Sequence, residues 1–188
     1  MSSIKLSPNV SGTGSLTIAA PNTNTDRTLT LPDESGTVLT SASPVIAQAG
    51  VPAFRVWQSA GQSISNAVDN VILFQTKETD TTNAFNTSTS KFQPTVAGYY
   101  LLTAHVGYSA NATGERWAKI AVGGAIKASS GVFNTGSGWV VPSVSVVAYM
   151  NGTTDYAQVF GWQNSGGNLN SLNLQGYCGF SGVFVGAA

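Results

Sequence analysis

The sequence predicts an all-β protein with a sandwich or jelly-roll fold, and three observations support this prediction. Short apolar runs of strand length alternate with turn-forming residues from position 53 onward. No window of ten residues combines helical periodicity with capping residues. The polarity comes from neutral side chains, since only 9% of the 188 residues are charged and the formal net charge is zero. A helical bundle or an average enzyme would carry far more Glu, Lys and Arg.

Residues 1–44 differ in composition from the rest of the chain, because they contain no Trp, Tyr or Phe. Three phrases alternate apolar residues with Thr or Ser, at 15–18, 28–31 and 37–40. Strands without aromatic residues bury too little surface to stand alone, so we expect an extended, β-rich arm that packs on another chain. The alternative is a disordered tail. The expected docking residues are Leu16, Ile18, Leu29, Leu31, Val38 and Leu39.

A linker over residues 45–52 separates this arm from an expected head domain, residues 53–188. The head contains seven apolar runs separated by Gly, Asn, Ser and Thr, which is typical of strands and turns. The expected strands are Phe54–Gln58, Asn70–Thr76, Gly98–Tyr108, Arg116–Val122, Val140–Met150, Tyr156–Trp162 and Gly176–Val185.

Two of these strands are apolar on both faces, which favours an oligomer. In the strand 98–108 the even-numbered side chains from Tyr100 to Tyr108 form an ordinary core face, but the opposite face also begins with apolar residues. A solvated face of an antiparallel sheet should be polar, so a neighbouring subunit is expected to cover it. The candidate interface residues are Tyr99, Leu101, His105, Tyr156 and Phe160.

The segment Phe92–Tyr100 reads Phe-x-Pro-x-x-x-Gly-x-Tyr, and residues 180–184 read Phe-Ser-Gly-Val-Phe. Both resemble the globular head of complement C1q, a trimeric jelly roll shared with the tumour-necrosis-factor superfamily, over residues 53–186. The resemblance implies ten strands in two sheets and a homotrimer that uses one sheet face. The collagen-like stalk and the calcium-binding aspartates of that family have no counterpart here, so no metal is expected.

Residues 27–39, Arg-Thr-Leu-Thr-Leu-Pro-Asp-Glu-Ser-Gly-Thr-Val-Leu, resemble the start of many tailed-phage virion proteins, which are fibre-like and usually trimeric. This resemblance implies a place on the virion surface. The sequence starts without the apolar segment of a secretion signal, and its Cys178 has no partner for a disulfide. Both features fit synthesis in the cytoplasm of a bacterial host.

The chemistry-bearing residues predict neither catalysis nor a cofactor. His105 is the only histidine, no Gly-x-Ser-x-Gly motif is present, and His and Cys together number two, too few for zinc. Glu78 and Asp80 fall in a Thr-rich segment, 76–82, that we interpret as a solvated loop. A pI near 6.5 without a basic run argues against nucleic-acid binding. No apolar stretch is long enough for membrane insertion.

Trp139 and Trp162 lie beside glycine-rich loops that are rich in Asn, Gln and Ser. Such rings could stack on a sugar, or they could simply cap the barrel or fill the trimer axis.

Taken together with the two resemblances, the sequence predicts a non-enzymatic, homotrimeric virion surface protein. It would be a capsid decoration (cement) or head-fibre protein that contacts the major capsid protein or tail components through its arm. The alternative is a short tail fibre whose head recognises a host-surface glycan.

Overall fold

The computed structural model describes residues 11–12, 24–26, 28 and 51–188. The fold concerns residues 51–188. Most of the expected arm and linker lies outside the described residues. So do all six expected docking residues, Leu16, Ile18, Leu29, Leu31, Val38 and Leu39.

The described residues contain thirteen strands and no helix. The strands are β1 (Ala53–Trp57), β2 (Ser63–Ile64), β3 (Asn70–Val71), β4 (Thr76–Asp80), β5 (Phe85–Asn86), β6 (Lys91–Phe92), β7 (Gly98–Val106), β8 (Glu115–Val122), β9 (Ala125–Phe133), β10 (Ser143–Met150), β11 (Ala157–Gln163), β12 (Leu169–Asn170) and β13 (Cys178–Gly186).

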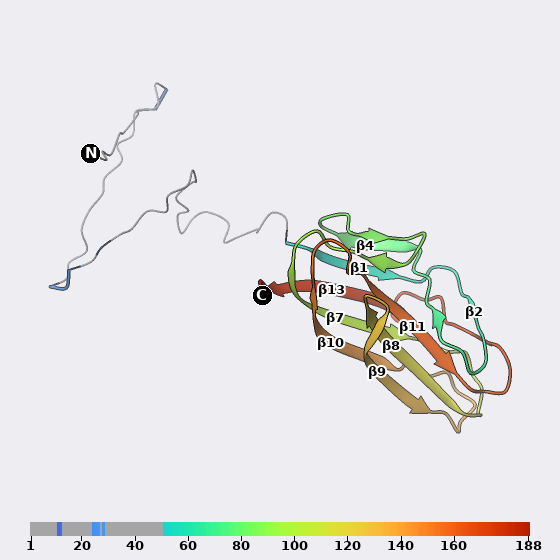
Figure 1. Ribbon diagram of the computed structural model, residues 1–188. Helices are drawn as coiled ribbons and strands as arrows, with labels where there is room; N and C mark the ends of the chain where they lie inside the picture. The colour runs from blue at the N-terminus through green and yellow to red at the C-terminus, as the bar shows by residue number, and fades with distance from the viewer. Residues whose placement is uncertain (1–10, 13–23, 27, 29–50) are drawn as a thin grey trace. The chain divides into compact units, whose positions relative to one another are not determined.

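The strands form two main antiparallel sheets that pack into a jelly-roll sandwich. The first sheet has the order β10-β7-β13-β1-β4, which can be followed through the labels in Figure 1. The second has the order β5-β6-β11-β8-β9, with β3 also paired to β11. A small third sheet joins β12 to β2. The all-β prediction is therefore confirmed, with short additional strands beyond the ten that the resemblance implied.

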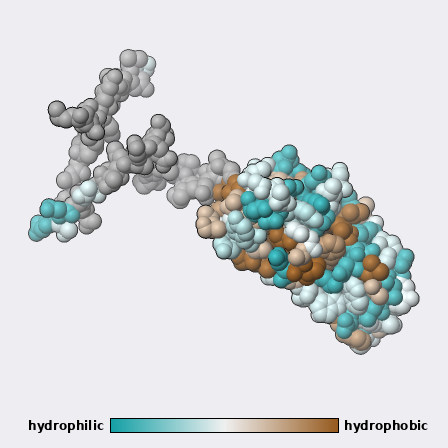
Figure 2. All heavy atoms as spheres, viewed as in Figure 1, coloured by the Kyte–Doolittle hydropathy of each residue, from teal (hydrophilic) through white to brown (hydrophobic). Residues whose placement is uncertain are grey.

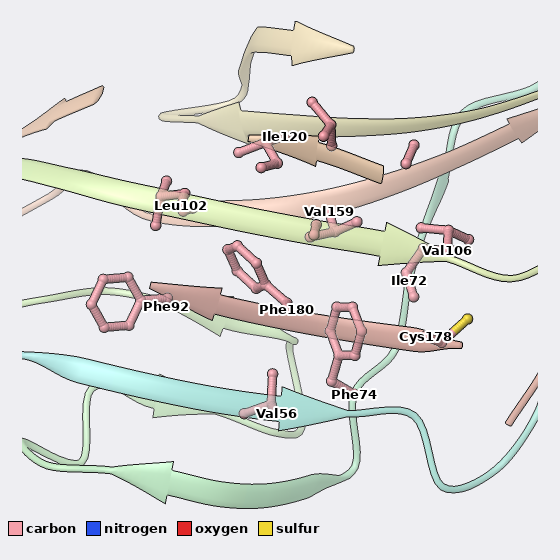
Figure 3. Packing of buried hydrophobic residues seen from close by; sticks show 14 of the residues in the cluster. Val56, Ile72, Phe74, Phe92, Leu102, Val106, Ile120, Val159, Cys178 and Phe180 are labelled. Atoms are coloured by element: carbon pink, nitrogen blue, oxygen red, sulfur yellow. The ribbon is translucent and has the colours of Figure 1, made fainter. Parts of the chain in front are cut away.

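The core lies between the two main sheets because each long strand turns its alternate side chains inward. In β7 the side chains of Tyr100, Leu102, Ala104 and Val106 are fully buried, as the sequence predicted. Figure 3 shows Leu102 from β7, Phe180 from β13 and Val159 from β11 directed into this layer. Burial of these apolar faces is what holds the sandwich together.

A cluster of aromatic rings fills the part of the core near β1. Phe54 stacks on Phe92 with 4.1 Å between ring centroids and meets the edge of Phe180 at 4.8 Å. Offset and edge-to-face contacts of this kind add to the free energy gained by burial. These contacts connect β1 and β13 of the first sheet with β6 of the second.

At the level of single strands, one sequence prediction is wrong and one strand was not predicted. The segment around Glu78 and Asp80 is not a loop, because both residues lie in β4 and β4 pairs with β1. The strand β9 was missed because it is an edge strand with most of its side chains exposed, so it lacks the alternation that marks a half-buried strand.

Candidate functional site

The outer face of the first sheet carries a patch of apolar side chains, called the sheet-face patch below. Its members are Tyr99, Leu101, Val147, Tyr149, Val183 and Val185, each between 39% and 59% exposed. Strand register places Leu101 between Val147 on β10 and Val183 on β13, so these side chains form a continuous row. Single exposed apolar residues are ordinary, but a contiguous group on one sheet face marks an interaction surface.

Two tyrosines extend the sheet-face patch toward one end of the sheet. Tyr99 lies directly opposite Tyr149, and their rings meet edge to face with 5.8 Å between centroids. Tyr99 and Leu101 were predicted from the sequence, whereas the members on β10 and β13 were not. The signal for them was present, because Val147 and Tyr149 alternate with the core residues of the predicted strand 140–150.

The other end of the same sheet face is polar. Arg55 on β1 forms an ion pair with Glu78 on β4, with 3.3 Å between Nε and Oε2. His105 on β7 packs over Gly179 of β13, where a Cβ would lie 2.6 Å from the imidazole Cε1. Burial, reinforced by the charge of Arg55, lowers the pKa of His105, so the imidazole is neutral at pH 7.

A second group of exposed apolar side chains lies on β9, the edge strand of the second sheet. In β9, Ile126, Val132 and Phe133 are exposed, and Phe133 is 66% exposed. A hollow of about 450 Å³ beside β10 is lined by Val122, Val146, Ala148, Lys127 and Asp155 together with Val147 and Tyr149 of the sheet-face patch. Long exposed edge strands are aggregation hazards unless another chain covers them.

Tyr156 and Phe160 do not join the sheet-face patch. Tyr156 precedes β11 and Phe160 lies within it, and β11 belongs to the second sheet. The ammonium of Lys91 sits 3.7 Å from the centroid of the Tyr156 ring, and Phe160 is paired with Val71 of β3. The predicted interface residues therefore fall into two groups on different sheets.

A pair of tryptophans marks the outer face of the second sheet. Trp117 on β8 lies directly opposite Trp162 on β11, and both are half-buried. A hollow of about 270 Å³, called the aromatic hollow below, is lined by Glu115, Trp117, Lys119, Ser129 and Trp162. Trp162 was a predicted glycan contact, whereas Trp117 was missed because strand register cannot be read from one sequence.

Trp139 lies elsewhere, in the connection between β9 and β10. Its ring meets Tyr177 edge to face with 4.6 Å between centroids, and it is 54% exposed. Trp139 and Trp162, the two predicted glycan contacts, therefore have different aromatic neighbours.

The remaining chemistry-bearing groups have structural partners. Asp80 accepts hydrogen bonds from the backbone N–H groups of Ala84 and Phe85 and from the Lys77 ammonium. Cys178 is fully buried, and burial raises the pKa of its thiol to about 11. Within residues 51–188 and the few described before them, no three His, Cys, Asp or Glu side chains gather as a metal site would require. That same part of the chain offers no helix able to cross a bilayer.

A polar hollow of about 490 Å³ near β4, β5 and β6 is lined by Asn, Thr and Gln side chains together with Lys77 and Lys91. Both cations are already engaged. Lys77 donates to Asp80 and to Asn83, each at 2.8 Å, and Lys91 lies over the Tyr156 ring.

Comparison with solved structures places this head among jelly rolls of known type. The globular domain of zebrafish complement 1qA protein superposes with a TM-score of 0.58 at 18% identity, covering 73% of this chain and 99% of its own. Murine APRIL gives a TM-score of 0.59 at 9% identity, covering 72% and 99%. The PRD1 vertex protein P5 gives 0.50 at 15% identity, covering 72% and 73%.

These likenesses show the fold, which is the jelly roll of C1q-like and tumour-necrosis-factor-like heads. The resemblance carried by Phe92–Tyr100 and by residues 180–184 is thereby confirmed at the level of fold. No protein-family model and no curated protein sequence matches the chain.

Proposed function

We propose that the chain is a non-enzymatic, homotrimeric surface protein of a bacteriophage particle. Residues 1–44 would attach it to the major capsid protein or another virion component, and the head would project. The observation that carries this proposal is the presence of two different groups of exposed apolar side chains on one head, the sheet-face patch and the side chains of Ile126, Val132 and Phe133 on β9.

Two different surfaces favour a ring rather than a simple dimer. A two-fold dimer uses the same surface on both partners, whereas a head-to-tail contact joins two unlike surfaces and closes into a ring when the rotation allows. The Phe133 and Ile126 side chains of one edge would cover the Leu101 row of the next head. The C1q-like and tumour-necrosis-factor-like heads that the sequence resembles assemble as trimers, which sets the expected number at three.

The position of Pro52 and Ala53, where the head begins, is consistent with this arrangement. The N–H of Phe184 donates to the carbonyl oxygen of Pro52 at 2.9 Å, and Ala53 pairs with Val183 of the sheet-face patch. In three heads joined through this face, Pro52 and Ala53 would therefore lie at the same end of the trimer. The similarity of the fold to a phage vertex protein, and of residues 27–39 to phage virion proteins, supports a place on the virion surface.

The trimer is tested by the mass of the full chain in solution. Light scattering should give three times the chain mass of 19.3 kDa. Val147→Glu should shift the protein toward monomer while circular dichroism stays unchanged, because the new carboxylate would be buried unpaired in the interface. Val68→Glu is the matched control, since Val68 is 55% exposed and Val147 is 56% exposed. A wild-type monomer at micromolar concentration would contradict the proposal.

The position on the particle is tested by copy number. Quantitative mass spectrometry against the major capsid protein should find hundreds of copies for a capsid decoration or head fibre. A few tens or fewer would instead indicate the second candidate role, a short tail fibre. That role is favoured by the aromatic hollow, whose side chains suit recognition of a glycan on the host surface.

A further inference from the structure

The aromatic hollow is built by three neighbouring strands of the second sheet. Strand register aligns Gly131 on β9, Trp117 on β8 and Trp162 on β11 in one row across the sheet. The next row brings Ser129 of β9 beside Lys119 of β8. A site assembled on regular strands holds its side chains more precisely than one assembled on loops.

The Trp117 ring is fixed in place by two contacts. It lies against Gly131, where a Cβ would come within 2.5 Å of Cδ2 and Cε2 of the indole. Its Nε1–H donates to Oε2 of Glu115 at 2.9 Å. The absence of a side chain at position 131 and the bond to Glu115 together lay the ring along the sheet.

The backbone beneath the two tryptophans is held from inside the core. The hydroxyl of Tyr108 is 2.6 Å from the Trp117 carbonyl oxygen and 3.3 Å from that of Trp162. Gly161, which precedes Trp162, leaves the space that this hydroxyl occupies, because a Cβ there would lie 2.8 Å from it. The aromatic pair is therefore supported before any ligand arrives, which lowers the entropic cost of binding.

The charges around the hollow balance. Lys119 donates to Asp69 at 2.6 Å and lies 5.8 Å from the centroid of the Trp162 ring. Arg116, on the inner side of β8, is buried with its guanidinium bonded to backbone carbonyls, and Glu115 is its neighbour. Two acids and two bases leave no net charge to attract a polyanion, so nucleic acid and acidic glycans are disfavoured.

We propose that the aromatic hollow binds one ring of a neutral oligosaccharide. The C–H face of a pyranose is apolar and carries slight positive charge, and it complements the negative face of an indole. The carboxylate of Glu115, the ammonium of Lys119 and the hydroxyl of Ser129 surround the rings and can hydrogen-bond sugar hydroxyls. A volume of about 270 Å³ suits a single ring with its neighbours extending into solvent.

This inference deepens the tail-fibre role given above and adds Trp117, Glu115 and Lys119 to the residues that would carry it. It is tested on the full chain by isothermal titration calorimetry with hexasaccharides of α-1,4-glucose, β-1,4-glucose and N-acetylglucosamine, and with sialyllactose as an acidic probe. We expect at least one neutral hexasaccharide to bind with a dissociation constant of about 0.1–10 mM. Sialyllactose should bind more weakly.

Trp117→Ala and Trp162→Ala should each weaken binding at least about tenfold. Gly131→Val provides a variant that keeps both indoles but displaces the Trp117 ring, and it should weaken binding as well. Trp139→Ala is the matched control, because it removes an exposed indole outside the hollow, and it should bind like the wild type.

Three outcomes would overturn the inference: no binding of any neutral probe, equal loss in Trp139→Ala, or full binding by Trp117→Ala. Solution mass is measured on the same samples. A trimer that falls apart in Trp117→Ala would make the hollow a subunit contact and also overturn the inference. A wild-type monomer that still binds sugar would instead count against the proposed trimer alone.

Discussion

The hydroxyl of Tyr108 donates a hydrogen bond from inside the core to the carbonyl oxygen of Trp117, across 2.6 Å. The phenol thereby connects the segment just after β7, a strand of the first sheet, with the beginning of β8 in the second. Burial raises the pKa of Tyr108 well above its ordinary value, so the hydroxyl keeps its proton and remains a donor. A bond between the layers at this point stabilises the sandwich and positions the outer aromatic pair.

Tyr108→Phe should lower the free energy of unfolding by about 1–3 kcal/mol, because it leaves the carbonyl oxygen of Trp117 without this donor. Urea denaturation followed by circular dichroism measures this loss. Tyr149→Phe is the control, since Tyr149 is 45% exposed and should lose little. Equal midpoints for the two variants would show that the buried bond contributes nothing.

Gly98→Ala should be destabilising by about 1–3 kcal/mol or more. Gly98 has a φ of 151°, and a Cβ there would lie 2.5 Å from both the Gly186 carbonyl oxygen and the Phe184 ring. Gly138→Ala is the control, because nothing lies within 4 Å of its Cβ position. Thermal unfolding of both variants checks the prediction, and a Gly98→Ala protein as stable as Gly138→Ala would refute it.

Stability should fall as the pH drops below about 6.5, and His105 should contribute to the fall. Its pKa is lower in the folded protein than in the unfolded chain, so the unfolded chain binds more protons between the two pKa values. The stabilisation by the neutral imidazole is complete above the unfolded pKa and is lost as the pH falls toward the folded one.

His105 is paired with Gly179 and Ser143 on the adjacent strands, Trp57 on β1 lies across Gly179, and Arg55 on β1 is the charged group that acts on the imidazole. Melting temperatures of wild type and His105→Gln between pH 7.5 and 5 provide the measurement, with a steeper decline expected for the wild type. Parallel curves for the two proteins would exclude this role for His105.

Cys178 should resist thiol reagents in the folded protein. Its Sγ lies 3.1 Å from the backbone nitrogen of Gly107 in the core, and a pKa of about 11 leaves almost no thiolate at neutral pH. A chromogenic disulfide reagent should react about 100-fold or more slowly with native protein than with protein in urea. Rapid labelling of the native state would mean that β13 opens at this position.

The sequence was most informative where one face of a strand is buried. The alternation in residues 98–108 predicted the core face of β7 correctly, and the motif from Phe92 to Tyr100 predicted the fold. The structure gives a physical reason for the Gly in that motif, since Gly98 sits where no other side chain fits.

The candidate surfaces were only partly predictable, because they depend on strand register. The pairing of Trp117 with Trp162 joins residues 45 positions apart and leaves no local pattern. Strand β9 was missed since its exposed side chains follow no two-residue period, although the Gly131 that accommodates Trp117 lies within it. Tyr156 and Phe160 alternate like interface residues, yet they lie just before and within β11, a strand of the second sheet.

The position of β13 bears on how the protein is made. This strand, residues 178–186, lies between β7 and β1 in the middle of the first sheet, although it comes last among the thirteen strands in chain order. During synthesis the edges of β1 and β7 that pair with β13 stay unpaired, and the sheet closes only after residue 186 has left the ribosome. A chain interrupted before Cys178 would lack β13 and expose two unsatisfied strand edges to chaperones and proteases, so the first sheet can close only in a chain that includes residues 178–186.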